Sequence, residues 1–145
     1  MSEKEILVGW REWVALPQLG LARIKAKIDT GARTSVLHAF QVDVFHESGK
    51  AKVRFAIHPR QRNTHKVIIC EANLLDTRWI TDSGGHRDLR HVVQTELVMG
   101  DRSTLIEISL TSREDMLFRM LLGRTALHNG YVINPTASYL LKKKK

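Results

Sequence analysis

The strongest constraint on the fold is a hydrophobic pattern with a period of two. Over residues 21–29 apolar side chains alternate with basic ones, and residues 51–57 repeat the pattern. Successive side chains of a strand point to opposite faces, so this alternation predicts strands with one buried face and one wet, basic face. Further strand candidates are residues 6–10, 12–16, 36–46, 66–71, 91–99, 105–110 and 116–122.

Turn-forming residues separate these candidates, and helical patterning is almost absent. Only residues 124–128 are typical of a short helix, which Asn129-Gly130 would end as a C-cap. Many short strands at near-regular spacing favour a closed β-barrel or a sandwich. We therefore expect an all-β domain over residues 1–141, with one short C-terminal helix, followed by a basic tail, 142–145.

Composition narrows the classes of function. The 145 residues include 23 Lys and Arg against 15 Asp and Glu, a formal charge of +8 that attracts polyanions. The few aromatic residues do not interleave with basic ones, which argues against dedicated nucleic-acid binding. No apolar run is as long as a membrane span, and the polar N-terminus does not resemble a secretory signal. Cys70 has no second cysteine to pair with, which favours a reducing compartment, so we expect a cytoplasmic protein.

One candidate for chemistry stands where the first alternating strand ends. Asp29-Thr30-Gly31-Ala32 follows Ile28 directly, and an acid, a small hydroxyl and a glycine form a tight turn that can expose the carboxylate. The same three residues also occur in ordinary turns, so this motif alone leaves both interpretations open. A second element strengthens the catalytic one: the apolar residues 120–122 lead into Gly123-Arg124 and the expected helix.

Together these segments resemble the retropepsin-like aspartic proteases. Residues 28–32, with Ser35-Val36-Leu37 after them, are similar to the active-site loop and next strand of that family. Residues 121–124, followed by 125–127, are similar to its closing strand, glycine, arginine and helix. Over the whole chain the closer resemblance is to bacterial RimB-like, RimK-associated proteins, often described as ATP-dependent zinc proteases. Residues 26–38, 83–95 and 121–135 carry that similarity.

The resemblance implies a retropepsin-like closed barrel and an aspartic endopeptidase mechanism. Two nearby carboxylates share one proton, and together they activate a water that attacks the scissile carbonyl. Asp29, Thr30 and Gly31 would be the catalytic segment, and Thr30 would brace the two loops. Since the chain offers one fitting acid, the dyad requires a homodimer. The substrate-binding positions would be Ala32, Arg33, Ser83, Gly84 and Gly85, with Gly123 and Arg124 supporting the site.

A second copy of the motif, Asp82-Ser83-Gly84, fits a hairpin tip better than a catalytic loop. It leads into Gly85 and polar residues, where a catalytic loop would lead into an apolar strand.

The sequence contains no recognised motif for binding a metal ion or a nucleotide. The chain has no His-Glu-x-x-His, and Gly49-Lys50 lacks the remainder of a phosphate-binding loop. His86 with His91, or His58 with His65 and Cys70, could be imagined as zinc ligands, but none has a recognised spacing. We expect no metal, no ATP and no other cofactor.

Arg33 departs from the retroviral pattern, which has an aspartate at that position pairing with the arginine after the glycine. Arg33 and Arg124 are like charges, so they either form a clamp for a substrate carboxylate or each meets another acid, such as Glu12 or Glu114. The resemblance also links this family to ligases that add glutamate to ribosomal protein tails. We therefore expect cleavage of an acidic, glutamate-extended protein. The alternatives are a non-catalytic peptide- or ribosomal-protein-binding module on the same fold, and a zinc-dependent hydrolase.

Overall fold

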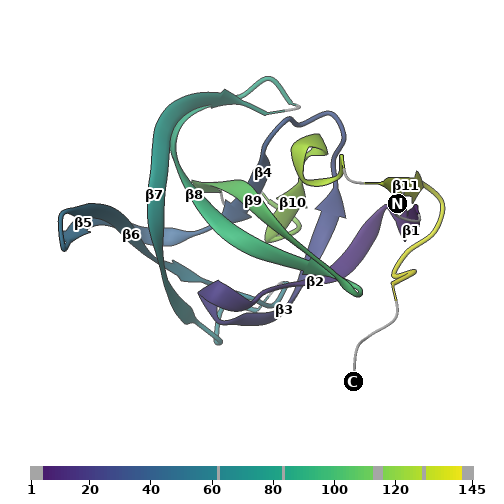
Figure 1. Ribbon diagram of the computed structural model, residues 1–145, viewed down its shortest axis with the longest axis horizontal. Helices are drawn as coiled ribbons and strands as arrows, with labels where there is room; N and C mark the ends of the chain where they lie inside the picture. Colours follow the sequence, from purple (N-terminus) through teal and green to yellow (C-terminus); the bar gives the residue numbers. More distant parts are fainter. Residues whose placement is uncertain (1–4, 62, 83, 113–115, 129, 142–145) are drawn as a thin grey trace.

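The computed structural model describes residues 5–61, 63–82, 84–112, 116–128 and 130–141. Nine of the described strands form one sheet, and six of these close a ring (Figure 1). In order around the ring they are β2 (Arg11–Leu16), β3 (Leu21–Ile28), β10 (Met120–Leu122), β4 (Ser35–His38), β9 (Arg102–Thr111) and β8 (Arg87–Met99). The ring closes where β8 meets β2 through Ala15 and Val98. The chain is therefore all-β, as the alternation predicts.

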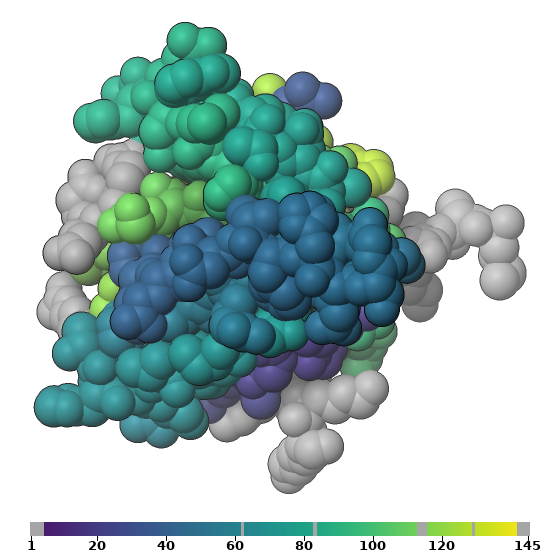
Figure 2. Space-filling model, turned by 90° about the vertical axis from the view of Figure 1, so that its left-hand side faces the viewer, coloured from purple at the N-terminus to yellow at the C-terminus, as the bar shows by residue number. Residues whose placement is uncertain are grey.

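Three strands extend the sheet outward from β8: β7 (Ile68–Thr81), β6 (Lys50–Ile57) and β5 (Phe40–Glu47). In Figure 2, β5 crosses the face toward the viewer, and the β7–β8 hairpin rises above it. Alternation along β3 and β6 places one row of side chains inside, where Ile24 and Phe55 are fully buried. Burial of this apolar area is the main term that stabilises the fold.

The ends of the described chain meet beside the ring. β1 (Ile6–Gly9) pairs in parallel with β11 (Tyr131–Asn134). Glu12 is fully buried, and its carboxylate accepts backbone N–H groups from Gly9 at 2.7 Å, Leu140 at 2.8 Å and Leu141 at 3.1 Å. The suggestion that Glu12 pairs with an active-site arginine is therefore wrong, because its oxygens hold the two ends of the chain together. Glu114, the other acid suggested, and the tail 142–145 lie outside the described residues.

Several strand boundaries differ from the expected ones. Residues 36–46 divide into β4 and β5, because β4 pairs inside the ring while β5 pairs with β6 outside it. β7 continues ten residues past the expected end at Glu71, with an irregularity between Leu74 and Asp76 that breaks the alternation. β11 was not expected.

The expected helix over residues 124–128 is shorter than predicted. It is a single 3-10 turn, η2 (Arg124–Ala126), held by N–H groups of Ala126 and Leu127. A second 3-10 turn, η1 (Pro17–Leu19), links β2 to β3. None of the helices in the described part of the chain has the length and apolar character needed to cross a membrane.

Candidate functional site

Asp29 lies at a point where three strands converge. β10 is inserted between β3 and β4, parallel to the first and antiparallel to the second, so the connection from β3 to β4 loops over its end. The Asp29 N–H donates to the Leu122 carbonyl at 2.8 Å, and Asp29 Oδ1 accepts the Gly31 N–H at 3.1 Å. Asp29 is half-buried while Thr30 and Gly31 are exposed. The tight turn thus holds the carboxylate at the molecular surface.

The backbone of Gly123 lies unusually close to the backbone of this loop, at Arg33 and Thr34. A Cβ atom on Gly123 would lie 2.7 Å from the carbonyl carbon of Thr34 and 2.8 Å from the oxygen of Arg33. The Gly123 N–H also donates to Ser35 Oγ at 3.0 Å. Because carbon atoms make optimal contact near 3.5 Å or beyond, only glycine leaves room for the loop in this position.

The η2 turn, which follows Gly123 directly, is bonded to the same loop. Its Arg124 N–H donates to the Ala32 carbonyl at 2.8 Å, and Thr125 Oγ1 donates to the Arg33 carbonyl at 2.7 Å. The Arg124 guanidinium lies 3.4 Å from the Thr30 carbonyl oxygen. The first N–H groups of the turn, which have no partner within a helix, are therefore bonded by the loop. These contacts make Arg124 a brace of the loop.

The hairpin of β7 and β8 arches above the loop (Figure 1). At its tip Asp82 Oδ1 accepts N–H groups of Gly84 at 3.0 Å and His86 at 2.9 Å, and Gly85 has φ +87°. The interpretation of this segment as a hairpin tip is confirmed for its described residues, Asp82, Gly84 and Gly85. Ser83, expected to bind substrate, lies outside the described residues.

A cavity of about 210 Å³ separates the loop from the hairpin. Asp29, Ala32 and Arg33 line it from the loop, and Arg78, Asp82 and Arg90 line it from the hairpin. A second cavity of about 300 Å³ shares Asp82 and Arg90 with the first, and Gly84 also lines it. Gly85 lines neither of these two cavities. Together the cavities give an extended space beside Asp29, between loop and hairpin.

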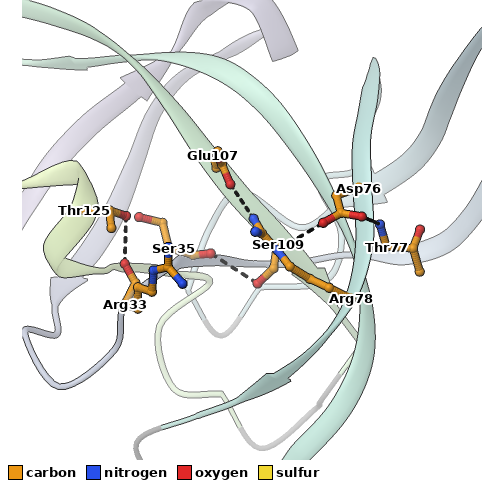
Figure 3. Close-up of polar contacts among 8 residues, drawn as sticks. All are labelled: Arg33, Ser35, Asp76, Thr77, Arg78, Glu107, Ser109 and Thr125. Carbon is orange, nitrogen blue, oxygen red and sulfur yellow. Dashed lines mark hydrogen bonds and ion pairs between the residues drawn. The ribbon is translucent and has the colours of Figure 1, made fainter.

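The charged side chains around the first cavity differ in their pairing. Figure 3 shows Arg78 reaching from β7 toward Glu107 on β9, with Asp76 on its other side; the Arg78 Nε to Asp76 Oδ2 distance is 3.8 Å. Arg33 is exposed, and no acid among the described residues pairs with its guanidinium. Arg33 lines this cavity and Arg124 does not, so the two arginines suggested as a possible carboxylate clamp do not share it.

The candidate zinc ligands have other partners. The His58 ring stacks on Phe40 with centroids 4.4 Å apart, and His91 Nδ1 lies 2.8 Å from Thr77 Oγ1. Cys70 is buried, and its thiol donates to the Leu19 carbonyl at 3.2 Å. Burial raises the pKa of Cys70 to about 11, which disfavours the thiolate that binds metals. Across the part of the chain that is described, no three His, Cys, Asp or Glu side chains gather as a metal site.

Comparison with known proteins shows which family this chain belongs to. The model of the RimB-like family, described as retropepsin-like aspartic endopeptidase RimB, matches residues 7–144. The chain belongs to the RimB-like family. The resemblance inferred from residues 28–32 and 121–124 is thereby confirmed, at the level of the family.

Similar proteins carry this domain in a longer chain. The chain is 38% identical over 144 residues to a probable alpha-L-glutamate ligase of Shewanella pealeana, covering 99% of this chain and 31% of the ligase. It is 40% identical over 138 residues to a protein of the same description from Parasynechococcus marenigrum, covering 95% of this chain and 30% of that one. The chain thus spans under a third of these relatives. A solved structure from Legionella pneumophila, of unknown function (DUF785), superposes with a TM-score of 0.76 at 25% identity, covering 94% of this chain and 98% of that one.

Two arginines in this site escaped the sequence analysis. Arg78 on β7 and Arg90 on β8 are direct partners in the antiparallel strand register. Arg90 lies within the segment of resemblance 83–95 but was not singled out there, and the residues around Arg78 do not alternate cleanly. Only the strand register brings both side chains to the space beside Asp29.

Proposed function

We propose that this chain is an aspartic endopeptidase that works as a homodimer. Each copy supplies Asp29, and the paired carboxylates hold one proton between them. The ionised one takes a proton from a water that attacks the scissile carbonyl, and the protonated one donates a hydrogen bond to the carbonyl oxygen. The observation that carries the proposal is Asp29 itself, held by a braced turn next to a cavity under the β7–β8 hairpin.

Three features support pairing through this loop. Asp29 is the only carboxylate on the loop 29–34, and Asp82, the other acid that lines its cavity, accepts N–H groups of its own hairpin tip. Thr30 and Gly31 are exposed at the loop tip, where a second copy can reach them. The terminal sheet also exposes apolar side chains, Leu7 on β1 and Val132 on β11. In this proposal the ring of six strands is the retropepsin-like closed barrel, and Thr30 braces the two loops.

The proposed substrate is an acidic peptide, such as a glutamate-extended protein tail, in the cytoplasm. The net charge of +8 attracts such a chain, and Arg33 offers a guanidinium without an acidic partner among the described residues. The relatives named as alpha-L-glutamate ligases carry a similar domain in one polypeptide with their own activity. An enzyme that adds glutamate and one that removes it would act on the same tail.

Hydrolysis of a glutamate-rich peptide by wild type and by Asp29→Asn, each with and without EDTA, tests this proposal. The amide keeps the shape of the carboxylate but cannot act as a base, so we expect activity to vanish while the melting temperature changes little. Wild-type activity should persist in EDTA and need no ATP. Peptide binding without hydrolysis would favour a binding module, and EDTA-sensitive activity that zinc restores would favour a metal-dependent hydrolase.

A further inference from the structure

We infer that Arg90 is a specificity residue that binds a carboxylate of the substrate close to the scissile bond. This inference rests on the proposed function and deepens it. Net charge alone would favour any acidic peptide. A guanidinium at one place beside Asp29 would instead require an acidic side chain at one fixed position of the bound peptide.

Arg90 is a buried cation with unused hydrogen-bond donors. Its side chain is 1% exposed, and its Nε donates to Asp88 Oδ1 at 2.8 Å. Nη1 is buried and has no hydrogen-bond partner. The contact with Asp88 is the only hydrogen bond that the described residues give to this guanidinium. Buried guanidinium groups are normally fully bonded, so an unsatisfied one indicates a partner that arrives from outside the chain.

The position of Arg90 places this donor on the substrate path. Arg90 lines both the cavity that contains Asp29 and the larger cavity next to it. A peptide that extends from one cavity into the other would run beside Arg90 and the other residues that line both, Val36, Asp82 and Leu121. Lys27 lines the second cavity and adds a further positive charge there.

The two terminal nitrogens of the Arg90 guanidinium favour a carboxylate as their partner. Asp88 uses Nε, which leaves Nη1 and Nη2 side by side as a fork that two carboxylate oxygens can accept together. The Asp88 side chain is 43% exposed, so solvent screens its charge. Asp88 therefore only partly neutralises the buried guanidinium of Arg90.

The other two arginines of the site are less suited to this role. Arg78 forms ion pairs with two acids of this chain, Asp76 and Glu107, whose combined charge exceeds its own. Arg33 is exposed, so solvent weakens any single contact that it makes and leaves it able to follow several positions of a peptide. Arg90 combines burial, an Nη1 without a hydrogen-bond partner and a fixed place, which are the properties that discriminate one side chain from another.

The test compares peptides that carry Glu or Gln at each position in turn of an otherwise constant sequence. For wild type we expect kcat/KM to favour Glu over Gln about 10- to 100-fold at one position near the cleaved bond. Arg90→Gln should reduce that ratio to near unity, and the loss of kcat/KM should be larger for the Glu peptide than for the Gln peptide. Arg90→Lys should keep part of the preference. Arg87→Gln is the matched control, since Arg87 is an exposed neighbour on the same strand that covers Trp79, and its ratio should equal that of wild type.

A second measurement separates this inference from the proposed catalysis. In an Asp29→Asn background, titration with the same peptides measures binding, and Arg90→Gln should again remove the preference for Glu. An unchanged Glu/Gln ratio in Arg90→Gln, or equal losses for both peptides with an unchanged melting temperature, would overturn the role of Arg90. If wild type cleaved no peptide but the binding preference depended on Arg90, the endopeptidase proposal would fail while the carboxylate site would stand.

Discussion

Replacing Gly123 by alanine should move the catalytic loop without touching any reacting group. The new Cβ atom would lie 2.7 Å from the carbonyl carbon of Thr34 and 2.8 Å from the oxygen of Arg33. Since carbon atoms make optimal contact at about 3.5 Å or more, the loop must retreat by roughly 0.8 Å. A misplacement of about 1 Å can cost 100-fold in rate, so we expect kcat to fall about 10- to 100-fold with a small change in KM.

The matched control is Gly49→Ala, in the turn between β5 and β6. Gly49 has φ +78° and free space around it, so alanine there strains the backbone by about 1 kcal/mol and leaves the site in place. Overpacking at Gly123 should cost about 1–3 kcal/mol of stability. Peptide hydrolysis, measured well below both melting temperatures, should therefore separate the two variants. Full kcat in Gly123→Ala, or equal rate losses in both, would refute the claim that Gly123 sets the position of the loop.

The remaining predictions concern stability, pH and substrate charge. Glu12→Ala leaves three backbone N–H groups without their buried acceptor and should lower the unfolding free energy by about 3 kcal/mol or more in urea titrations; a loss below about 1 kcal/mol would contradict this. Because the Cys70 thiol ionises near pH 9.0 when unfolded and near 11 when folded, stability should fall by about 2–3 kcal/mol across that window, and Cys70→Ala should lose this dependence. Arg33→Ala should lower kcat/KM for acidic peptides about 10-fold or more, less so at high salt, and leave neutral peptides nearly unchanged; equal losses on both would assign Arg33 a structural role.

Local patterns predicted the strands whose pairing is simple. The alternation in residues 21–29 and 51–57 marks β3 and β6, because each buries one face of its strand. The break between β4 and β5 at Ala39 has no such mark, since it arises from a change of pairing partner. The strand predicted to end at Glu71 continues to Thr81 as β7, and the prediction failed for a related reason. Leu74 and Leu75 are adjacent apolar residues at an irregularity in the pairing, where a period of two fails.

The candidate site was predictable where it is contiguous in sequence. Asp29, Gly31 and Gly123 stand in recognisable segments, and the structure brings those segments into contact. Arg90 was not predictable, because its proximity to Asp29 depends on how the β7–β8 hairpin folds over the loop. The contact of η2 with the loop was also not predictable from local sequence, since Arg124 and Thr125 donate their N–H groups to carbonyls about 90 residues earlier in the chain, at Ala32 and Arg33.

The central claim is that one catalytic site needs Asp29 from two chains, and mixing chains tests it most directly. Wild type is combined with an equal amount of Asp29→Asn, at concentrations well above dimer dissociation, and left to exchange subunits. Random pairing leaves about a quarter of the dimers with two aspartates, so the rate per wild-type chain should fall to about half, and further with more of the variant. A rate that stays constant however much Asp29→Asn is added, with the two chains shown to exchange, would mean that a single Asp29 suffices and would contradict the shared dyad.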